Sequence, residues 1–134
     1  MSLASYDLIW SMGGNTFCLR EAMKVSGFDE IIQRLLASGH IYGGASAGAI
    51  VTAPTIGWST PMENPEQASE YVRQGLGLVD FCPIPHITSP KYRASARIAA
   101  ALAREEGYEI EELRDGEAII VNGPRRLRLG ENLS

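Results

Sequence analysis

The stretch from Ile41 to Val51 constrains the fold more than any other part of the sequence. A short apolar run ends in two glycines, a serine follows between two alanines, and a second apolar run comes next. Gly44, Ser46 and Gly48 match the G-x-S-x-G pattern, in which a strand turns sharply into a helix and presents a serine. Side chains at either glycine would collide with the neighbouring strand or helix. The pattern predicts a nucleophilic serine at the end of a buried strand.

This elbow interpretation also predicts the surroundings of the serine. Ser46 would lie at the positive end of a helix dipole, and the backbone N–H of Ala47 would point to where an oxyanion forms. The same five letters also fit an ordinary turn of small residues, because the pattern is short and common. A base and a second oxyanion donor elsewhere in the chain are therefore needed to support a nucleophile.

Length and composition describe an ordinary globular protein. The chain has 134 residues, which suits one domain over 1–134, with 45% apolar and 21% charged residues. The net charge of −4 leaves no evident basic face, so we expect no nucleic-acid partner. The basic cluster of Arg125, Arg126 and Arg128 is typical of a solvated strand edge.

The cysteines and the apolar runs exclude other classes of protein. Cys18 and Cys82 make neither a disulfide framework nor a zinc site with the two histidines, so we expect buried thiols and no metal or cofactor. The N-terminus lacks the pattern of a signal peptide, and no apolar run is long enough to cross a membrane. We therefore expect a cytoplasmic protein without a membrane partner.

Apolar periodicity and turn residues predict an alternation of strands and helices. The expected elements are a strand over 6–12, a helix from Asn15 or Thr16 to Ser26-Gly27, a helix from about Asp29 to Gly39, the buried strand at Ile41-Tyr42, a helix over 92–106, and short strands over 108–113, 118–121 and 127–129. The order strand, helix, helix, strand, helix implies parallel strands joined by right-handed crossovers. The predicted fold class is α/β.

Two connections carry further information. Residues 54–77 are rich in proline, glycine and acidic residues, which predicts an irregular surface loop with one helical turn. A loop of this length beside an elbow is often a lid or a specificity segment. Asn122-Gly123 is a strong signal for a hairpin between the last two strands.

A serine needs a base to accept its proton, and the sequence has two histidines. His40 precedes the elbow strand, so it should lie at the end of that strand opposite to Ser46. His86 ends an apolar segment that two prolines stiffen, and in parallel α/β sheets the active edge is where the strands end. His86 is therefore the better base.

A carboxylate should hold the imidazole in the correct tautomer. Asp115 follows both partners in the chain and lies in an Asp-Gly turn, while Glu63 and Glu117 are alternatives. An oxyanion hole needs a second backbone N–H besides that of Ala47. The Gly13-Gly14 loop could supply it, because no side chain blocks approach there.

Six separated segments of the chain form a larger pattern around the elbow. In chain order they are Gly13-Gly14-Asn15-Thr16-Phe17, Tyr42-x-Gly44-x-Ser46-Ala47-Gly48-Ala49, Pro54-Thr55-Ile56, Gly77-Leu78-Val79, Pro85-His86 and Asp115-Gly116. This series resembles the aspartyl dipeptidases (peptidase E) and their cyanophycinase relatives, which are serine peptidases. The segments keep the family's order over most of the chain, so the match is more specific than the elbow alone.

The resemblance implies a flavodoxin-like α/β fold of the class I glutamine amidotransferase type, a three-layer sandwich with a mostly parallel sheet. It implies that Ser46 is the nucleophile, that His86 is the base and that Asp115 is the third triad member. Gly14 and Ala47 take the positions of the oxyanion hole.

The resemblance also implies contacts to a small peptide substrate. Asn15 and Thr16 belong to the matching loop. Aspartyl dipeptidases hold the acidic side chain of the substrate with an arginine in the helix after the histidine, and Arg93 and Arg97 lie in that region.

The chain departs from the family pattern in two places. Family members carry an additional N-terminal portion, whereas this chain begins at the strand before the Gly13-Gly14 loop, so the resemblance implies an N-terminally truncated member. An uncovered apolar sheet edge is an aggregation hazard, so we expect a homodimer that covers it. The family often has Asn-Asp-Met after Pro-Thr-Ile, whereas Thr60-Pro61-Met62-Glu63 lacks that aspartate.

Three functions compete on this evidence. The leading hypothesis is a serine peptidase of the aspartyl dipeptidase type that hydrolyses small peptides through an acyl-enzyme on Ser46. The alternative is a catalytically inactive truncated homologue that acts as a binding or assembly module. An esterase or amidase of another class fits less well, because the pattern from Gly13 to Phe17 favours the dipeptidases.

Overall fold

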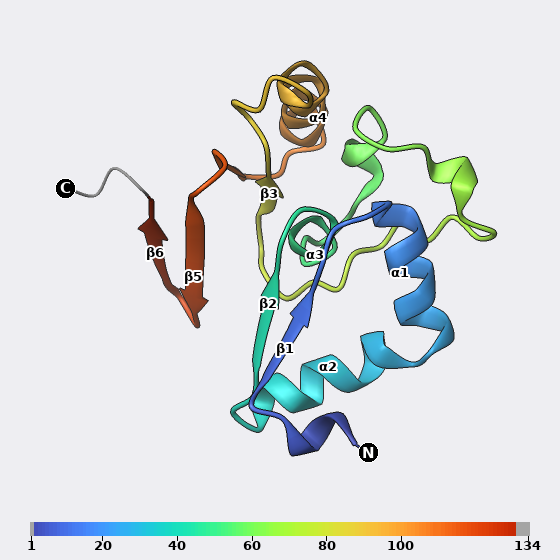
Figure 1. Ribbon diagram of the computed structural model, residues 1–134, viewed down its shortest axis with the longest axis vertical. Helices are drawn as coiled ribbons and strands as arrows, with labels where there is room; N and C mark the ends of the chain where they lie inside the picture. The colour runs from blue at the N-terminus through green and yellow to red at the C-terminus, as the bar shows by residue number, and fades with distance from the viewer. Residues whose placement is uncertain (1, 131–134) are drawn as a thin grey trace.

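The computed structural model describes residues 2–130, which form an α/β structure of short strands and packed helices (Figure 1). Its elements are η1 (Leu3–Ser5), β1 (Leu8–Ser11), α1 (Thr16–Val25), α2 (Phe28–Ala37), β2 (Ile41–Gly44), α3 (Ala47–Ile50), η2 (Gly57–Ser59), η3 (Pro65–Gln67), β3 (Cys82–Ile84), α4 (Arg93–Glu105), β4 (Ile110–Glu112), β5 (Ala118–Asn122) and β6 (Arg125–Leu129). Each predicted helix and strand is present, with small shifts at its ends.

The first half of the chain forms a parallel pair of strands with helices on one side. β1 and β2 pair so that Leu8 lies opposite Ile41 and Ser11 lies opposite Gly44. Helices α1 and α2 lie together on one side of this pair (Figure 1). The buried side chains that fill the space between them are Met23, Ile32, Leu35, Val51 and Leu76.

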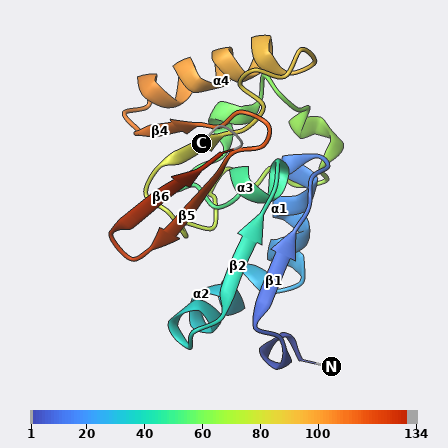
Figure 2. The same ribbon diagram turned by 60° about the vertical axis from the view of Figure 1, so that its left-hand side comes forward.

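The second half forms another parallel pair, with Cys82 of β3 opposite Ile110 of β4. Helix α4 lies along this pair, as Figure 2 shows most clearly. Its buried face consists of alanines, which allow the helix to approach closely: Ala96, Ala99, Ala100 and Ala103. Together with Phe17, Trp58 and Ile84, these alanines belong to the larger of the two core clusters.

The predicted single sheet is present only in pieces. Within residues 2–130 the strands form three two-stranded sheets, β1-β2, β3-β4 and β5-β6, of which the last is antiparallel. One reason is the sequence of β3, which is three residues long and contains Pro83. Proline has no backbone N–H, so this strand has few groups with which to extend a ladder toward β2.

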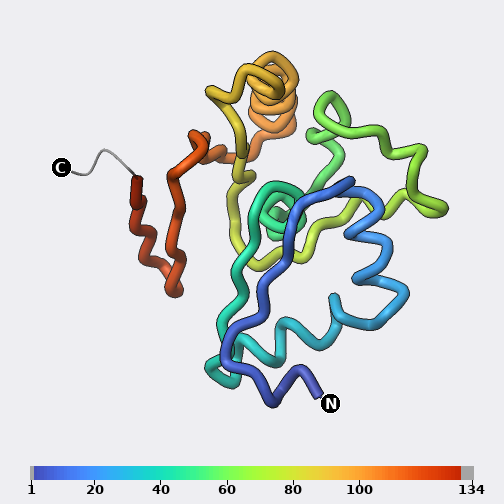
Figure 3. Tube along the Cα trace, viewed as in Figure 1, coloured from blue at the N-terminus to red at the C-terminus, as the bar shows by residue number. Residues whose placement is uncertain are grey.

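The long connection between α3 and β3 is not the surface loop that its composition predicts. Figure 3 shows this segment running from the centre of the molecule past the start of α1 and back toward β3. Ile56 and Trp58 are fully buried, and the indole N–H of Trp58 donates to the carbonyl of Thr55 over 2.6 Å. These apolar side chains enter the core although the segment is rich in proline and acidic residues.

The last two strands form the predicted hairpin, with Asn122 opposite Arg125 and Gly123 at a positive φ of 59°. Its arginines do more than solvate an edge. Arg126 makes ion pairs with Asp80, Glu109 and Glu111, and Arg128 pairs with Glu111 and Glu117. The basic cluster therefore connects the hairpin to β4, a role that its composition alone does not predict.

The two cysteines differ, although both were expected to be buried. Cys82 is fully buried, and burial followed by the charge of Glu106 raises the pKa of its thiol to about 12. Cys18 is only partly buried, because it lies on the first turn of α1 near the surface. Across residues 2–130, none of the helices is long and apolar enough to span a membrane.

Candidate active site

The chain turns sharply at Ser46, between the end of β2 and the start of α3. Ser46 has a φ of 55° and a ψ of −116°, a backbone conformation that non-glycine residues adopt rarely and that occurs at functional sites. The flanking glycines are needed for space. A Cβ at Gly44 would lie 2.2 Å from the carbonyl oxygen of Gly48, and a Cβ at Gly48 would lie 2.2 Å from that of Ser11.

Helix α3 is shorter than the elbow interpretation predicts. It runs only from Ala47 to Ile50, which is about one turn. A single turn aligns few peptide dipoles, so the stabilisation of negative charge near Ser46 depends on local N–H groups more than on a macrodipole. The hydroxyl of Tyr42 donates to the carbonyl of Gly48 over 2.6 Å and so connects β2 to this turn.

The Gly13-Gly14 loop follows β1 and lies beside the serine. A Cβ at Gly13 would lie 3.3 Å from the Cβ of Ser46 and 3.6 Å from its Oγ. Gly14 has a φ of 117°, a conformation that favours glycine. The parallel pairing of β1 and β2 explains this arrangement, because Ser11 and Gly44 are register partners at the end of the two strands.

His86 brings an imidazole to the same serine. Its Nε2 lies 3.1 Å from the Oγ of Ser46, and its Nδ1 lies 2.8 Å from Oδ1 of Asp115. These contacts fit the neutral tautomer in which Nδ1–H donates to the carboxylate and Nε2 accepts from the hydroxyl. The residue itself has a positive φ of 62°, and its ring packs against that of Tyr92 with centroids 4.9 Å apart.

The parallel pair β3-β4 explains why His86 and Asp115 meet. Ile84 and Glu112 are register partners at the end of these strands, so the segments after them leave the sheet at the same edge. The N–H of Ile87 then donates to the carbonyl of Leu113 over 3.1 Å. The imidazole side chain is 25% exposed and the Asp115 carboxylate is 62% exposed. Water therefore reaches the carboxylate more easily than the imidazole that contacts Ser46.

The other titratable groups that the sequence suggests lie elsewhere. Nδ1 of His40 contacts the carbonyl of Tyr6 at 2.7 Å, at the start of β2 and away from the elbow. Glu117 accepts from the backbone N–H of Arg114 over 2.7 Å and pairs with arginines. Glu63 accepts a hydrogen bond from the backbone N–H of Thr16.

The four predicted substrate contacts have different surroundings. The side-chain oxygen of Asn15 caps α1 by accepting from the N–H groups of Phe17 and Cys18. Thr16 is fully buried, and its Oγ1 has no hydrogen-bond partner among the described residues. Arg93 and Arg97 are exposed on α4, and within residues 2–130 neither forms an ion pair.

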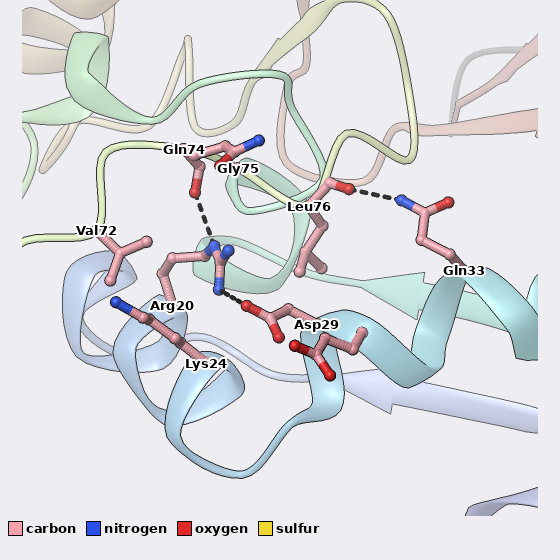
Figure 4. Close-up of a pocket in the computed structure, with 9 residues that line it drawn as sticks. Arg20, Lys24, Asp29, Gln33, Val72, Gln74, Gly75 and Leu76 are labelled. Carbon is pink, nitrogen blue, oxygen red and sulfur yellow. Dashed lines mark hydrogen bonds and ion pairs between the residues drawn. The ribbon is translucent and has the colours of Figure 1, made fainter.

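A polar pocket of about 560 Å³ lies apart from the serine, between α1, α2 and the segment around Gln74 (Figure 4). Arg20 occupies its centre and is 5% exposed. Its guanidinium donates to Asp29 over 2.9 Å and to the carbonyl of Gln74 over 2.7 Å, while the amide of Gln33 donates to the carbonyl of Leu76 over 2.8 Å. These polar groups satisfy one another's hydrogen-bonding capacity. We therefore assign them a structural role, which is to join α1 and α2 to the segment around Gln74. Among the described residues, no cluster of histidine, cysteine and acidic side chains could hold a metal ion.

Comparison with known proteins gives the family. The model of peptidase family S51 matches residues 1–128. The chain belongs to peptidase family S51. The resemblance to peptidase E in the sequence is confirmed, because one curated relative and one solved structure similar to this chain carry that name.

The curated relatives that this chain matches are longer than the chain. An uncharacterized peptidase of Listeria innocua is 34% identical over 90% of this chain and 57% of its own length. One from Pasteurella multocida is 32% identical over 97% and 63%, and Peptidase E of Streptomyces coelicolor is 30% identical over 93% and 53%. The chain therefore spans between half and two thirds of the length of these relatives.

A solved structure gives the same family at the level of the fold. The crystal structure of a candidate Peptidase E protein from Listeria monocytogenes matches with a TM-score of 0.79 and 32% identity, over 92% of this chain and 59% of the other. The S51 fold of this chain is thus α/β with parallel strands, close to that structure.

Proposed function

We propose that this S51 chain is a serine peptidase of the aspartyl dipeptidase type that hydrolyses small peptides through an acyl-enzyme on Ser46. The observation that carries the proposal is the distance of 3.1 Å between Oγ of Ser46 and Nε2 of His86, at a serine with strained backbone. Family membership supports a hydrolase, and a hydroxyl activated by an imidazole is the usual way to attack a peptide carbonyl.

The proposed mechanism assigns one task to each group. His86 takes the proton of Ser46 as Oγ attacks the carbonyl carbon, and later gives it to the leaving amine. Asp115 holds Nδ1–H and stabilises the imidazolium. The N–H groups of Gly14 and Ala47 donate to the oxyanion, and loss of one such donor costs about 3 kcal/mol of transition-state stabilisation.

The proposed fold and substrate follow from the family. The flavodoxin-like three-layer sandwich is supported by two parallel strand pairs with helices and by the match to a Peptidase E structure. An acidic side chain at the substrate's N-terminal residue would need a cation, and Arg93 and Arg97 are exposed near Tyr92, whose ring packs on His86. The substrate class is therefore a small peptide, with these arginines as the proposed determinants of an acidic preference.

Labelling with a fluorophosphonate tests the proposed nucleophile. A serine activated by His86 attacks phosphorus and displaces fluoride, so intact-mass and peptide-mass measurements should find one adduct, located on Ser46. The Ser46→Ala variant and unfolded wild-type protein serve as controls that should not react. Labelling of a different serine, or the absence of both labelling and dipeptide hydrolysis in folded protein, would contradict the proposal.

The second proposal is a catalytically inactive homologue that binds or assembles. Its motivation is that the chain spans 57% of the length of its Listeria innocua relative, so the activity of a longer peptidase is not thereby an activity of this chain. This function would be supported by a folded protein that does not react with the fluorophosphonate, cleaves neither dipeptides nor esters, and still binds peptides.

The proposed homodimer covers the outer side of β1. In the described part of the chain β1 pairs only with β2, and Leu8, Trp10 and Ile41 are 52%, 56% and 60% exposed. Light scattering should give about twice the chain mass of 14.5 kDa, because strands with free edges and apolar faces associate. Trp10→Glu should restore the monomer while circular dichroism stays unchanged. A wild-type mass of one chain at high micromolar concentration would refute the dimer.

A further inference from the structure

We infer that Glu63 is a positioning residue for the loop at Gly13-Gly14, a role that rests on the peptidase function proposed above. The carboxylate of Glu63 accepts a hydrogen bond from the backbone N–H of Thr16, the first residue of α1. The two residues are separated by 47 positions in the chain and the contact is partly buried. The contact joins the long α3–β3 connection to the helix that follows the glycine loop.

Asn15 connects the same two segments from the other side. Its Oδ1 accepts from the N–H groups of Phe17 and Cys18 over 2.9 and 3.1 Å. Its Nδ2 donates to the carbonyl of Asn64 over 2.9 Å and to Oε1 of Gln67 over 3.0 Å. We name residues 63–67 the clamp turn. It binds the backbone N–H of Thr16 and the side-chain amide of Asn15, at the start of α1.

The clamp turn is one of two anchors of the glycine loop. On the other side the loop begins at Ser11, which is held in register with Gly44 of the elbow strand. Between these anchors, no described heavy atom outside its two chain neighbours lies within 4 Å of the place where a Cβ of Gly14 would be, so that side of the residue is open. Two glycines in a row have the greatest backbone freedom, and the direction of the Gly14 N–H therefore depends on how firmly both ends are held.

Electrostatics explains why a carboxylate suits this place. Helix α1 is ten residues long, and the N–H groups of its first turn carry partial positive charge that a carboxylate stabilises. Glu63 and Asn15 together satisfy the N–H groups of Thr16, Phe17 and Cys18. The start of α1 is thus occupied from within the chain, and Glu63 acts through the backbone of Thr16 instead of through His86.

Two substitutions at Glu63 and one control test this role in dipeptide hydrolysis. Glu63→Ala removes the acceptor for the Thr16 N–H, and kcat should fall about 10- to 100-fold with KM within about threefold, because a misplaced oxyanion donor weakens only the transition state. Glu63→Gln keeps an oxygen that can accept, so its kcat should stay within about threefold of wild type. Glu66→Ala, an exposed acid in the same turn, should leave both constants unchanged.

Amide hydrogen exchange supplies a readout that does not need activity. In Glu63→Ala the amide of Thr16 should exchange at least tenfold faster, and that of Gly14 should shift in an NMR spectrum, whereas Glu63→Gln and Glu66→Ala should resemble wild type. Unchanged exchange at Thr16 in Glu63→Ala would overturn the inference. So would a Glu63→Ala variant whose Thr16 amide exchanges faster while its kcat stays within about threefold of wild type, because the contact would then hold the helix start without affecting the glycine loop.

The two proposals fail in distinguishable ways. A wild-type protein that hydrolyses no dipeptide or ester refutes the peptidase, while the exchange measurement still decides whether Glu63 holds the start of α1. The converse outcome is a wild type that hydrolyses dipeptides and a Glu63→Ala variant that has the same kcat, with active enzyme counted by fluorophosphonate labelling of Ser46. That result refutes the positioning role and leaves the peptidase proposal standing.

Discussion

Ser46→Ala should lower dipeptide hydrolysis about a million-fold, to the background rate of the assay, by analogy with removal of the nucleophile in other serine peptidases. The substitution removes the Oγ atom that would form the acyl bond. A water molecule activated by His86 would be a much weaker nucleophile than this positioned hydroxyl. The backbone strain at φ 55° is shared by serine and alanine, so the free energy of unfolding should change by less than about 1 kcal/mol.

The measurement needs purified protein, an intact-mass check and a thermal melt of each variant. Ser38→Ala is the matched control, because Ser38 caps the end of α2 before β2, at the end of that strand opposite to the elbow. Among the described residues, its Oγ donates to the carbonyl of Arg34. Its activity should equal that of wild type. Turnover by pure Ser46→Ala protein at more than a thousandth of the wild-type rate would remove Ser46 as the nucleophile.

Asp115→Asn should lower kcat about 100- to 1000-fold with little change in KM. An asparagine can turn its amide N–H toward Nδ1 of His86, which favours the tautomer with its proton on Nε2, and that nitrogen can then no longer accept from Ser46. Losses of about ten-thousand-fold accompany this change where the aspartate is buried. Here the carboxylate side chain is 62% exposed, so water competes for the imidazole and the expected loss is smaller.

Glu117→Gln is the control that separates the alternatives for the third triad member. Glu117 contacts the backbone N–H of Arg114 and two arginines instead of a histidine, so its substitution should change kcat by less than about threefold. Full activity in Asp115→Asn together with a large loss in Glu117→Gln would reverse the assignment. Both variants keep the side-chain volume, so a thermal melt close to that of wild type is expected for each.

Much of the local structure could be predicted because its causes are local. Asn15 caps α1 as its position before an apolar period predicts, Gly27 takes a positive φ of 78° where the first helix ends, and Asn122-Gly123 forms the hairpin turn. The glycines of the elbow could be predicted from the pattern, since a Cβ at Gly44 would meet the backbone of the turn itself and a Cβ at Gly48 would meet that of the neighbouring strand β1. The S51 family could also be recognised from six short segments.

Contacts between distant segments could not be predicted in the same way. Trp58 lies in a proline-rich stretch whose composition predicts a surface loop, yet its indole is fully buried. Arg126 reads as part of a basic strand edge, but it pairs with acids from two other segments. Both outcomes depend on which surfaces meet in three dimensions, and burial outweighs local composition once a core has formed.

The sequence by itself determined the α/β alternation, the strained turn at Ser46 and the family, because each depends on residue types at short spacing. Only the tertiary structure decided which carboxylate meets His86 and which holds the start of α1. The sequence favours Asp115 and leaves Glu63 and Glu117 as alternatives. In the structure the parallel register of β3 and β4 brings Asp115 to the imidazole, and the path of the α3–β3 connection brings Glu63 to Thr16. Strand register and loop path are set by packing over the whole molecule, so no local pattern encodes them.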